Sequence, residues 1–170
     1  LTELIQETAD DIQYLESISN ALDIAMNEAD LAQIKEELMQ SGYIRRKHTK
    51  KKVKLTSKPM HYISSDGYDM YVGKNNLQNE ELTFSFANGN DWWFHAKGAP
   101  GSHVIVKSGG DELPDRTFEE AGRLAAYYSK NRGADKVEID YIQKKLVKKP
   151  NGAKPGFVVY YPNYSLVIDS

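Results

Sequence analysis

The spacing of the apolar residues changes at Pro59, and no other feature of the sequence limits the fold as strongly. From Leu1 to Met39, apolar residues recur mostly three and four positions apart without an intervening proline. This spacing predicts an amphipathic helix or a pair of helices. After Pro59, short apolar and aromatic runs alternate with turns rich in Gly, Asp and Asn, which is typical of short antiparallel strands. We therefore expect a helical arm followed by an α+β domain.

The arm, residues 1–42, has its own start and stop signals. Asn27 is placed to cap a second helix that runs to Gln40, and Ser41-Gly42 supplies a C-terminal stop. Periodicity alone leaves two alternatives open. The arm is either half of a coiled coil, which pairs with a helix outside this sequence or with a second copy, or a helical cap packed on the domain.

The domain, residues 43–170, is expected to contain a largely antiparallel sheet and one main helix. The clearest helix covers 115–131, where Thr117 is placed to cap and an apolar stripe follows at helical spacing. Residues 77–86 fit a strand or a helix, and both alternatives stay open. Strands are expected at 61–63, 68–72, 93–96, 104–106, 136–141, 156–161 and 164–168, the last two joined as a hairpin.

The net charge of −2 hides an uneven distribution of charge along the chain. Residues 1–42 hold ten Asp or Glu against one Lys, whereas residues 43–170 hold 21 Lys or Arg against 14 acids. The cationic residues gather at 45–54 and again at 144–154, with amides and aromatics between the two runs. A single run is explained equally well by a solvated loop, but two runs in one domain favour contact with a phosphate backbone.

The stretch DWWFHAKGAPGSHVIV, residues 91–106, places four aromatic or histidine rings before a Gly-Ala-Pro-Gly turn and a second histidine after it. Neighbours on a strand point to opposite faces, so Trp92 and Phe94 share one face while Trp93 and His95 share the other. We expect one pair to pack in the core beneath the sheet and the other to lie near the surface, where it stacks on a base or contacts a partner protein. The alternative is that both tryptophans belong to the core.

Several kinds of chemistry lack the residues they need. The chain has no cysteine, and its four histidines fit none of the usual metal-ligand spacings. It contains no phosphate-binding glycine loop, no nucleophile elbow and no apolar run long enough to cross a bilayer. We therefore expect a binding protein rather than an enzyme, with no catalytic residue, metal, cofactor or membrane insertion.

Four segments carry a family resemblance by their order along the chain: SSDGYDMYVGKNNLQNEELTF, DWWFHAKGAPGSHVIV, EEAGRLAAYYSKNRGADKVEIDY and VKKPNGAKPGFVVYY. Together they resemble the NFACT-R domain, the C-terminal RNA-binding module of NFACT proteins, over roughly residues 43–168. The acidic helical segment before them resembles the returning end of the coiled-coil arm that precedes this domain in the family.

The resemblance implies a cytoplasmic module that binds large-subunit ribosomal RNA or tRNA in ribosome quality control. Its matching positions are the basic run 45–54 and the hairpin from His95 to His103, and no catalytic residue is implied. Some bacterial members are called fibronectin-binding proteins, so the alternative is an adhesin fragment that reaches the cell surface by a non-classical route and binds fibronectin. The residues predicted to contact RNA or another partner are Arg45, Arg46, Lys47, Lys50, Lys51, Lys52, Lys74, Asn75, Asn76, Trp92, Trp93, His95, Lys97, His103, Lys148 and Lys149.

Overall fold

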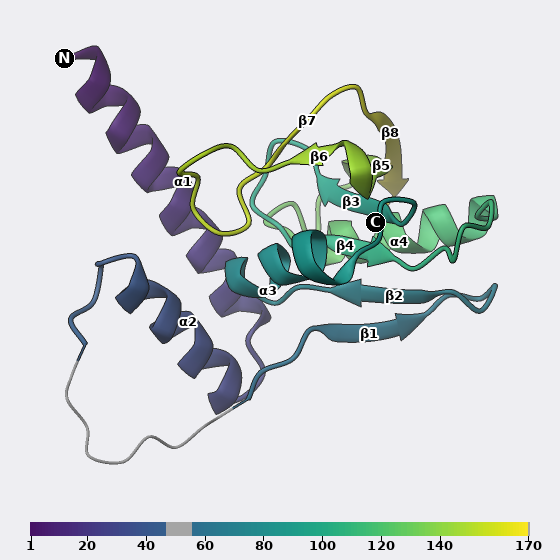
Figure 1. Ribbon diagram of the computed structural model, residues 1–170, viewed down its shortest axis with the longest axis horizontal. Coiled ribbons are helices and arrows are strands. Elements are labelled where there is room, and N and C mark those ends of the chain that lie inside the picture. The colour runs from purple at the N-terminus through teal and green to yellow at the C-terminus, as the bar shows by residue number, and fades with distance from the viewer. Residues whose placement is uncertain (47–55, 170) are drawn as a thin grey trace.

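The computed structural model describes residues 1–46 and 56–169, and it has the expected α+β class (Figure 1). Helices α1 (Thr2–Ile24) and α2 (Glu28–Gln40) form the arm, and the side chain of Asn27 caps α2 as predicted. The remaining elements are β1 (Met60–Ile63), β2 (Asp69–Val72), α3 (Asn76–Glu81), the π-helix η1 (Leu82–Phe86), β3 (Trp92–Ala96), β4 (Val104–Val106), α4 (Asp115–Tyr127), β5 (Lys136–Gln143), the 3-10 helix η2 (Lys144–Leu146), β6 (Val147–Lys148), β7 (Val159–Tyr160) and β8 (Tyr164–Asp169).

Six strands form one antiparallel sheet in the order β1-β2-β4-β3-β5-β8. Two predicted hairpins are present, because β1 pairs with β2 and β3 pairs with β4 across the Gly-Ala-Pro-Gly turn. β3 lies inside the sheet and also pairs with β5, which sets His95 directly opposite Asp140.

The predicted hairpin between residues 156–161 and 164–168 is wrong. β7 pairs with β6 in a separate two-stranded sheet, and β8 joins the edge of the main sheet beside β5. The apolar pattern of a short strand does not specify its neighbour, and pairing with β5 gives β8 six residue pairs in register.

Helix α4 covers one face of the main sheet, and the largest apolar cluster fills the space between them. Ala121 and Ala125 of the helix pack in this cluster with Phe94 of β3. The helix lies so close to β8 that a Cβ at Gly122 would stand 2.7 Å from the Leu166 side chain. The predicted apolar stripe is confirmed, but Thr117 does not cap: Pro114 holds the cap position.

The opposite face of the sheet is covered by η1 and by the small β6–β7 sheet. Leu82 and Val147 from these covering elements pack against Trp93, Ile105 and Ile142 of the main sheet. The segment 77–86, which the sequence left open, is therefore helical, because α3 and η1 span it. With both faces covered, neither aromatic pair of β3 lies fully open to solvent.

Helix α1 packs on the domain mainly through its C-terminal half. Tyr14 and Ile18 of α1 pack with Ile34 of α2, and Phe157 of the domain packs against this cluster. The N-terminal half of α1 projects beyond the domain (Figure 1), where Leu1, Leu4, Ile5 and Ile12 are exposed. The second half is thus a packed cap, and the exposed seam of the first half fits the coiled-coil alternative, which stays a prediction.

Polar side chains hold the joint between arm and domain. Lys74 Nζ lies 3.0 Å from Asp30 Oδ1, and both side chains are nearly inaccessible to solvent. Asn75 Nδ2 donates to Gln33 Oε1 over 2.7 Å, and Asn76 Nδ2 donates to Glu37 Oε2 over 3.0 Å. The acidic arm and the basic domain thus neutralise part of each other's charge.

Candidate nucleic-acid interface

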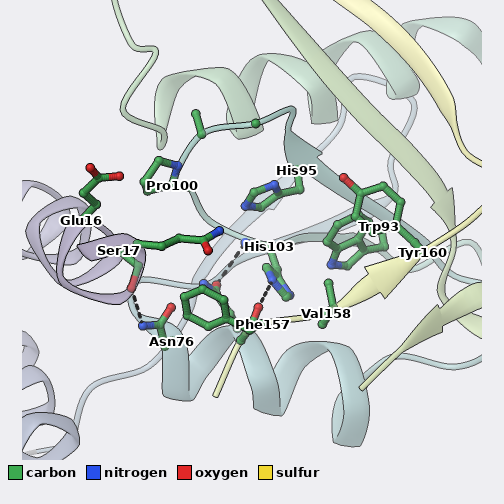
Figure 2. Close-up of a pocket in the computed structure, with 16 residues that line it drawn as sticks. Glu16, Ser17, Asn76, Trp93, His95, Pro100, His103, Phe157, Val158 and Tyr160 are labelled. Carbon is green, nitrogen blue, oxygen red and sulfur yellow. Dashed lines mark hydrogen bonds between the residues drawn. The ribbon is translucent and has the colours of Figure 1, made fainter. Parts of the chain in front are cut away.

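A cavity of about 290 Å³ opens between the arm and the domain (Figure 2). Helix α1 lines one side with Glu16 and Ser17, while α3 contributes Asn76 and Asn79. The turn 98–101 and the segment 156–158 complete the rim. The cavity therefore exists only where the arm packs on the sheet.

The sheet supplies an aromatic wall to this cavity. The rings of Trp93 and His95 lie nearly parallel, at 8°, with their centroids 5.6 Å apart. Tyr160 of β7 packs against Trp93 with centroids 4.8 Å apart, and Figure 2 shows the three rings on the side opposite Glu16 and Ser17. Trp93 is fully buried within this packing, while His95 is half-buried at the cavity.

His103 holds the cavity wall together and is itself buried. Its Nε2 lies 2.9 Å from the carbonyl oxygen of Gly156, which only accepts hydrogen bonds, so Nε2 carries the proton. Its Nδ1 therefore accepts from the Thr83 hydroxyl over 2.7 Å. The histidine in this way ties the segment 156–158 to η1.

Glu16 is the only Asp, Glu, Lys or Arg among the described residues that line the cavity. Burial lowers the pKa of His103 well below its ordinary value, and the neighbouring His95 lowers it further. Burial also lowers the pKa of His95, although the nearby Asp140 carboxylate partly opposes this effect. Both rings are therefore neutral at pH 7, and no Lys or Arg of the part of the chain that the structure describes lines the cavity.

Tyr160 is fixed in place by Asp140. Burial raises the pKa of the Tyr160 phenol, and its hydrogen bond to Asp140 raises that pKa further. The phenol stays protonated and donates to Asp140 Oδ2 over 2.6 Å. Asn163 and Ser165 donate to the other oxygen of Asp140, so this carboxylate anchors the wall and is not free to bind a ligand.

Five of the predicted contact residues are corrected by the structure, because they are buried in structural roles. Trp93 and His103 lie inside the covered face of the sheet. Lys74, Asn75 and Asn76 form the joint with the arm. A strand pattern shows which side chains share a face, but not whether other elements cover that face.

The remaining predicted residues differ in how freely they face solvent. Trp92 is half-buried and packs edge-on against Phe118 of α4, with centroids 5.0 Å apart. Lys149 is partly buried and pairs with Glu80 at 2.9 Å.

Three predicted cations remain accessible on the described surface. Arg46 and Lys97 pair with Glu36 and Glu138, but both pairs are solvent-exposed and contribute little to stability. Lys148 is exposed and has no acidic partner among residues 1–46 and 56–169.

The predicted phosphate contact of the first basic run stays a prediction. Arg45 is exposed at the end of the described segment. Lys47, Lys50, Lys51 and Lys52 lie outside the residues that the structure describes.

Sequence reasoning missed the cavity residues of the arm. In the sequence, the polar face of an amphipathic helix accounts for Gln13, Glu16 and Ser17. No local signal separates them from other polar positions of α1. The turn after His95, which the sequence pointed to, lines the cavity, but the opposite wall comes from residues about 80 positions earlier in the chain.

The buried His103 predicts a pH-dependent stability. The unfolded chain protonates this ring below pH about 6.5, while the folded protein keeps it neutral to lower pH. The unfolded state then binds more protons, so the free energy of unfolding falls as the pH drops below about 6.5, by at most about 1.4 kcal/mol per pH unit for one group. Replacing His103 with glutamine should make this fall shallower in urea denaturation at about pH 7.5, 6.5 and 5.5. An unchanged pH dependence would contradict the assignment.

Within the described ranges, no group of three or more His, Cys, Asp or Glu side chains is placed to hold a metal ion. No helix in the part of the chain that the structure describes has the length and apolar character needed to cross a membrane.

The fold and the cavity define a small α+β binding module joined to a helical arm. The chain belongs to the NFACT family. Residues 58–161 match the NFACT protein RNA-binding domain, and residues 1–57 match the NFACT N-terminal and middle domains. The resemblance drawn from the four segments is confirmed.

Known relatives agree with this assignment. The chain is 48% identical over 161 residues to the Rqc2 homolog RqcH of Streptococcus pneumoniae, covering 94% of this chain and 29% of the relative. It is 39% identical over 171 residues to the Rqc2 homolog RqcH of Bacillus subtilis, covering 98% of this chain and 29% of the relative. It therefore spans less than a third of the length of these relatives.

A solved structure shares the fold. The C-terminal part of the fibronectin/fibrinogen-binding protein from Streptococcus suis superposes with a TM-score of 0.91 at 43% sequence identity. The match covers 99% of this chain and 67% of that chain. The arm and the domain thus occur together in an independent structure of the same family.

Proposed function

We propose that this chain is an RNA-contacting part of a cytoplasmic ribosome quality-control factor, and that it acts by binding rather than catalysis. The observation that carries the proposal is the match of residues 58–161 to an RNA-binding domain. Relatives named as Rqc2 homologs, aligned over nearly the whole chain, support the ribosomal setting. The expected partners are large-subunit ribosomal RNA and tRNA.

A cationic surface at η2 and β6 supports contact with phosphates. Lys144, Lys145 and Lys148 lie within five positions, and none has an acidic partner among residues 1–46 and 56–169. Lys145 and Lys148 are exposed. Lysines that are not neutralised within the protein are the ones able to release counterions from a nucleic acid.

Replacing Lys144, Lys145 and Lys148 together with alanine should lower RNA affinity and reduce its salt dependence. If each lysine meets one phosphate of a single strand, the slope of log K against log salt falls by about 2 in magnitude, and affinity falls roughly ten-fold or more at low salt. Fluorescence anisotropy with tRNA and with a short single-stranded RNA, at several salt concentrations, measures both quantities.

The matched control removes the same charge elsewhere. Lys35, Arg123 and Lys136 are exposed and lie on other elements, so their triple alanine variant should change the slope much less. Equal effects of the two triple variants would show that only net charge matters. Saturable fibronectin binding by a chain that fails to bind either RNA would instead support the adhesin alternative, which the name of the Streptococcus suis relative suggests.

A further inference from the structure

The cavity between α1 and the β3–β4 turn differs chemically from the cationic surface at η2. Among residues 1–46 and 56–169, no Lys or Arg lines it, and its one acidic lining side chain is that of Glu16. A phosphate would therefore meet repulsion there rather than a counter-charge. An occupant should be flat and uncharged, because the partly exposed ring of His95, which lies parallel to the buried ring of Trp93, forms one wall.

The size of the cavity and the polar groups at its edges limit which uncharged ligands it can bind. A volume of about 290 Å³ lies at the lower end of the range for small-ligand sites. Amide groups stand along the rim, and among the described residues neither the Gln13 amide nor the Asn79 Nδ2 makes a hydrogen bond. Free amides beside an aromatic wall match the way in which proteins read the edge of an unstacked base.

We propose that this cavity binds a single unstacked nucleobase of the RNA that the module contacts, with His95, whose ring lies parallel to that of the buried Trp93, as the stacking surface and Gln13, Glu16 and Asn79 facing its edge. The proposal rests on the proposed function, since it names the ligand class of an RNA-binding module. It also gives the arm a direct part in recognition, because Gln13 and Glu16 belong to α1.

The surroundings suit a nucleotide that enters base first. Two lysines lie beside lining residues. The backbone N–H of Lys130 donates to the carbonyl of Pro100 over 2.9 Å, and Lys154 is close in sequence to Gly156. Their side chains are about one third exposed, and each pairs with an aspartate of α1. Phosphates can therefore remain outside the cavity while the base occupies it.

The proposal is tested on the whole chain by heteronuclear NMR with the four nucleoside monophosphates, each compared with ribose 5-phosphate. At least one nucleotide should shift the Trp93 indole and the amides of Gly98 and Gly101, and ribose 5-phosphate should not. Gln13→Ala should weaken this binding several-fold. Gln6→Ala is the matched control, because Gln6 lies on the same helix but outside the cavity.

A second measurement links the cavity to RNA. His95→Ala should lower affinity for single-stranded RNA about ten-fold, as expected for loss of one stacking contact, without changing the salt slope. The cavity proposal fails, and the proposed function stands, if the wild-type chain binds RNA with a clear salt dependence but no nucleotide shifts these signals, and if Gln13→Ala and His95→Ala both bind RNA normally. If the wild-type chain binds no RNA at low salt, the proposed function itself fails. Shifts caused by Nα-acetyl-arginine amide but by no nucleotide would identify a peptide site and overturn the proposal.

Discussion

Replacing Trp93 with alanine is expected to lower the free energy of unfolding by about 3–5 kcal/mol, the usual cost of deleting a large core side chain. Trp93 is 0% exposed and packs against His95, His103 and Tyr160. Its removal leaves a cavity between the sheet and the β6–β7 elements that cover it. Urea denaturation followed by circular dichroism measures the loss.

Two other substitutions make this prediction specific. The Trp93 Nε1 is buried without a hydrogen-bond partner among the described residues, a situation that costs about 1–3 kcal/mol. Trp93→Phe removes this donor along with part of the ring, so it should cost much less than Trp93→Ala. Trp92 is only half-buried, so Trp92→Ala should cost about 1–2 kcal/mol. Equal losses for the two alanine variants would contradict the difference in burial.

Replacing Lys74 with methionine should destabilise the protein by about 3–5 kcal/mol, because it leaves a buried carboxylate without its cation. Asp30 is 2% exposed at its side chain and lies 3.0 Å from Lys74 Nζ. Hydrogen exchange should show the largest loss of protection in α2, since this pair joins α2 to the domain. Lys35→Met, at an exposed position of the same helix, is the control and should change stability little.

The stability that the Asp30–Lys74 pair contributes is expected to fall at acidic pH. Burial alone raises the pKa of Asp30, but hydrogen bonds from the Met26 N–H, Ser57 and Lys74 outweigh it, so the pKa lies below its ordinary value. A depressed carboxyl pKa adds stability that is complete above about pH 4 and is lost as the pH falls through the folded pKa. Lys74→Met should reduce this acid-sensitive contribution, and Asp30→Asn combined with Lys74→Met should recover part of the lost stability.

Local patterns in the sequence predicted a large part of the fold. The apolar stripe in 115–131 predicted α4, and the turns at 64–67 and 97–101 predicted two hairpins. Asn27 predicted where α2 begins. Each of these depends on residues a few positions apart, whose spacing or turn chemistry is read directly. The pairing of β7 and β8 was missed because strand partners distant in the chain leave no local signal.

The candidate site was predictable only in part. Strand alternation correctly placed Trp93 and His95 on one face, and the charge counts predicted an acidic arm followed by a basic domain. Neither pattern reveals that Lys74 is used to hold the arm or that His103 is used to hold η1. Whether a lysine or a ring meets solvent depends on what packs over it, and here the covering groups come from elsewhere in the chain.

The sequence by itself determined the helical arm, the α+β domain, the faces of β3 and the family to which the chain belongs, because periodicity, turn chemistry and ordered motifs are properties of neighbouring residues. Only the tertiary structure decided that both faces of the sheet are covered and that α1 closes a cavity over Trp93 and His95. The cavity walls come from residues 13–17, 76–103 and 156–160, and contacts across such separations form only when the buried packing of the whole chain brings them together.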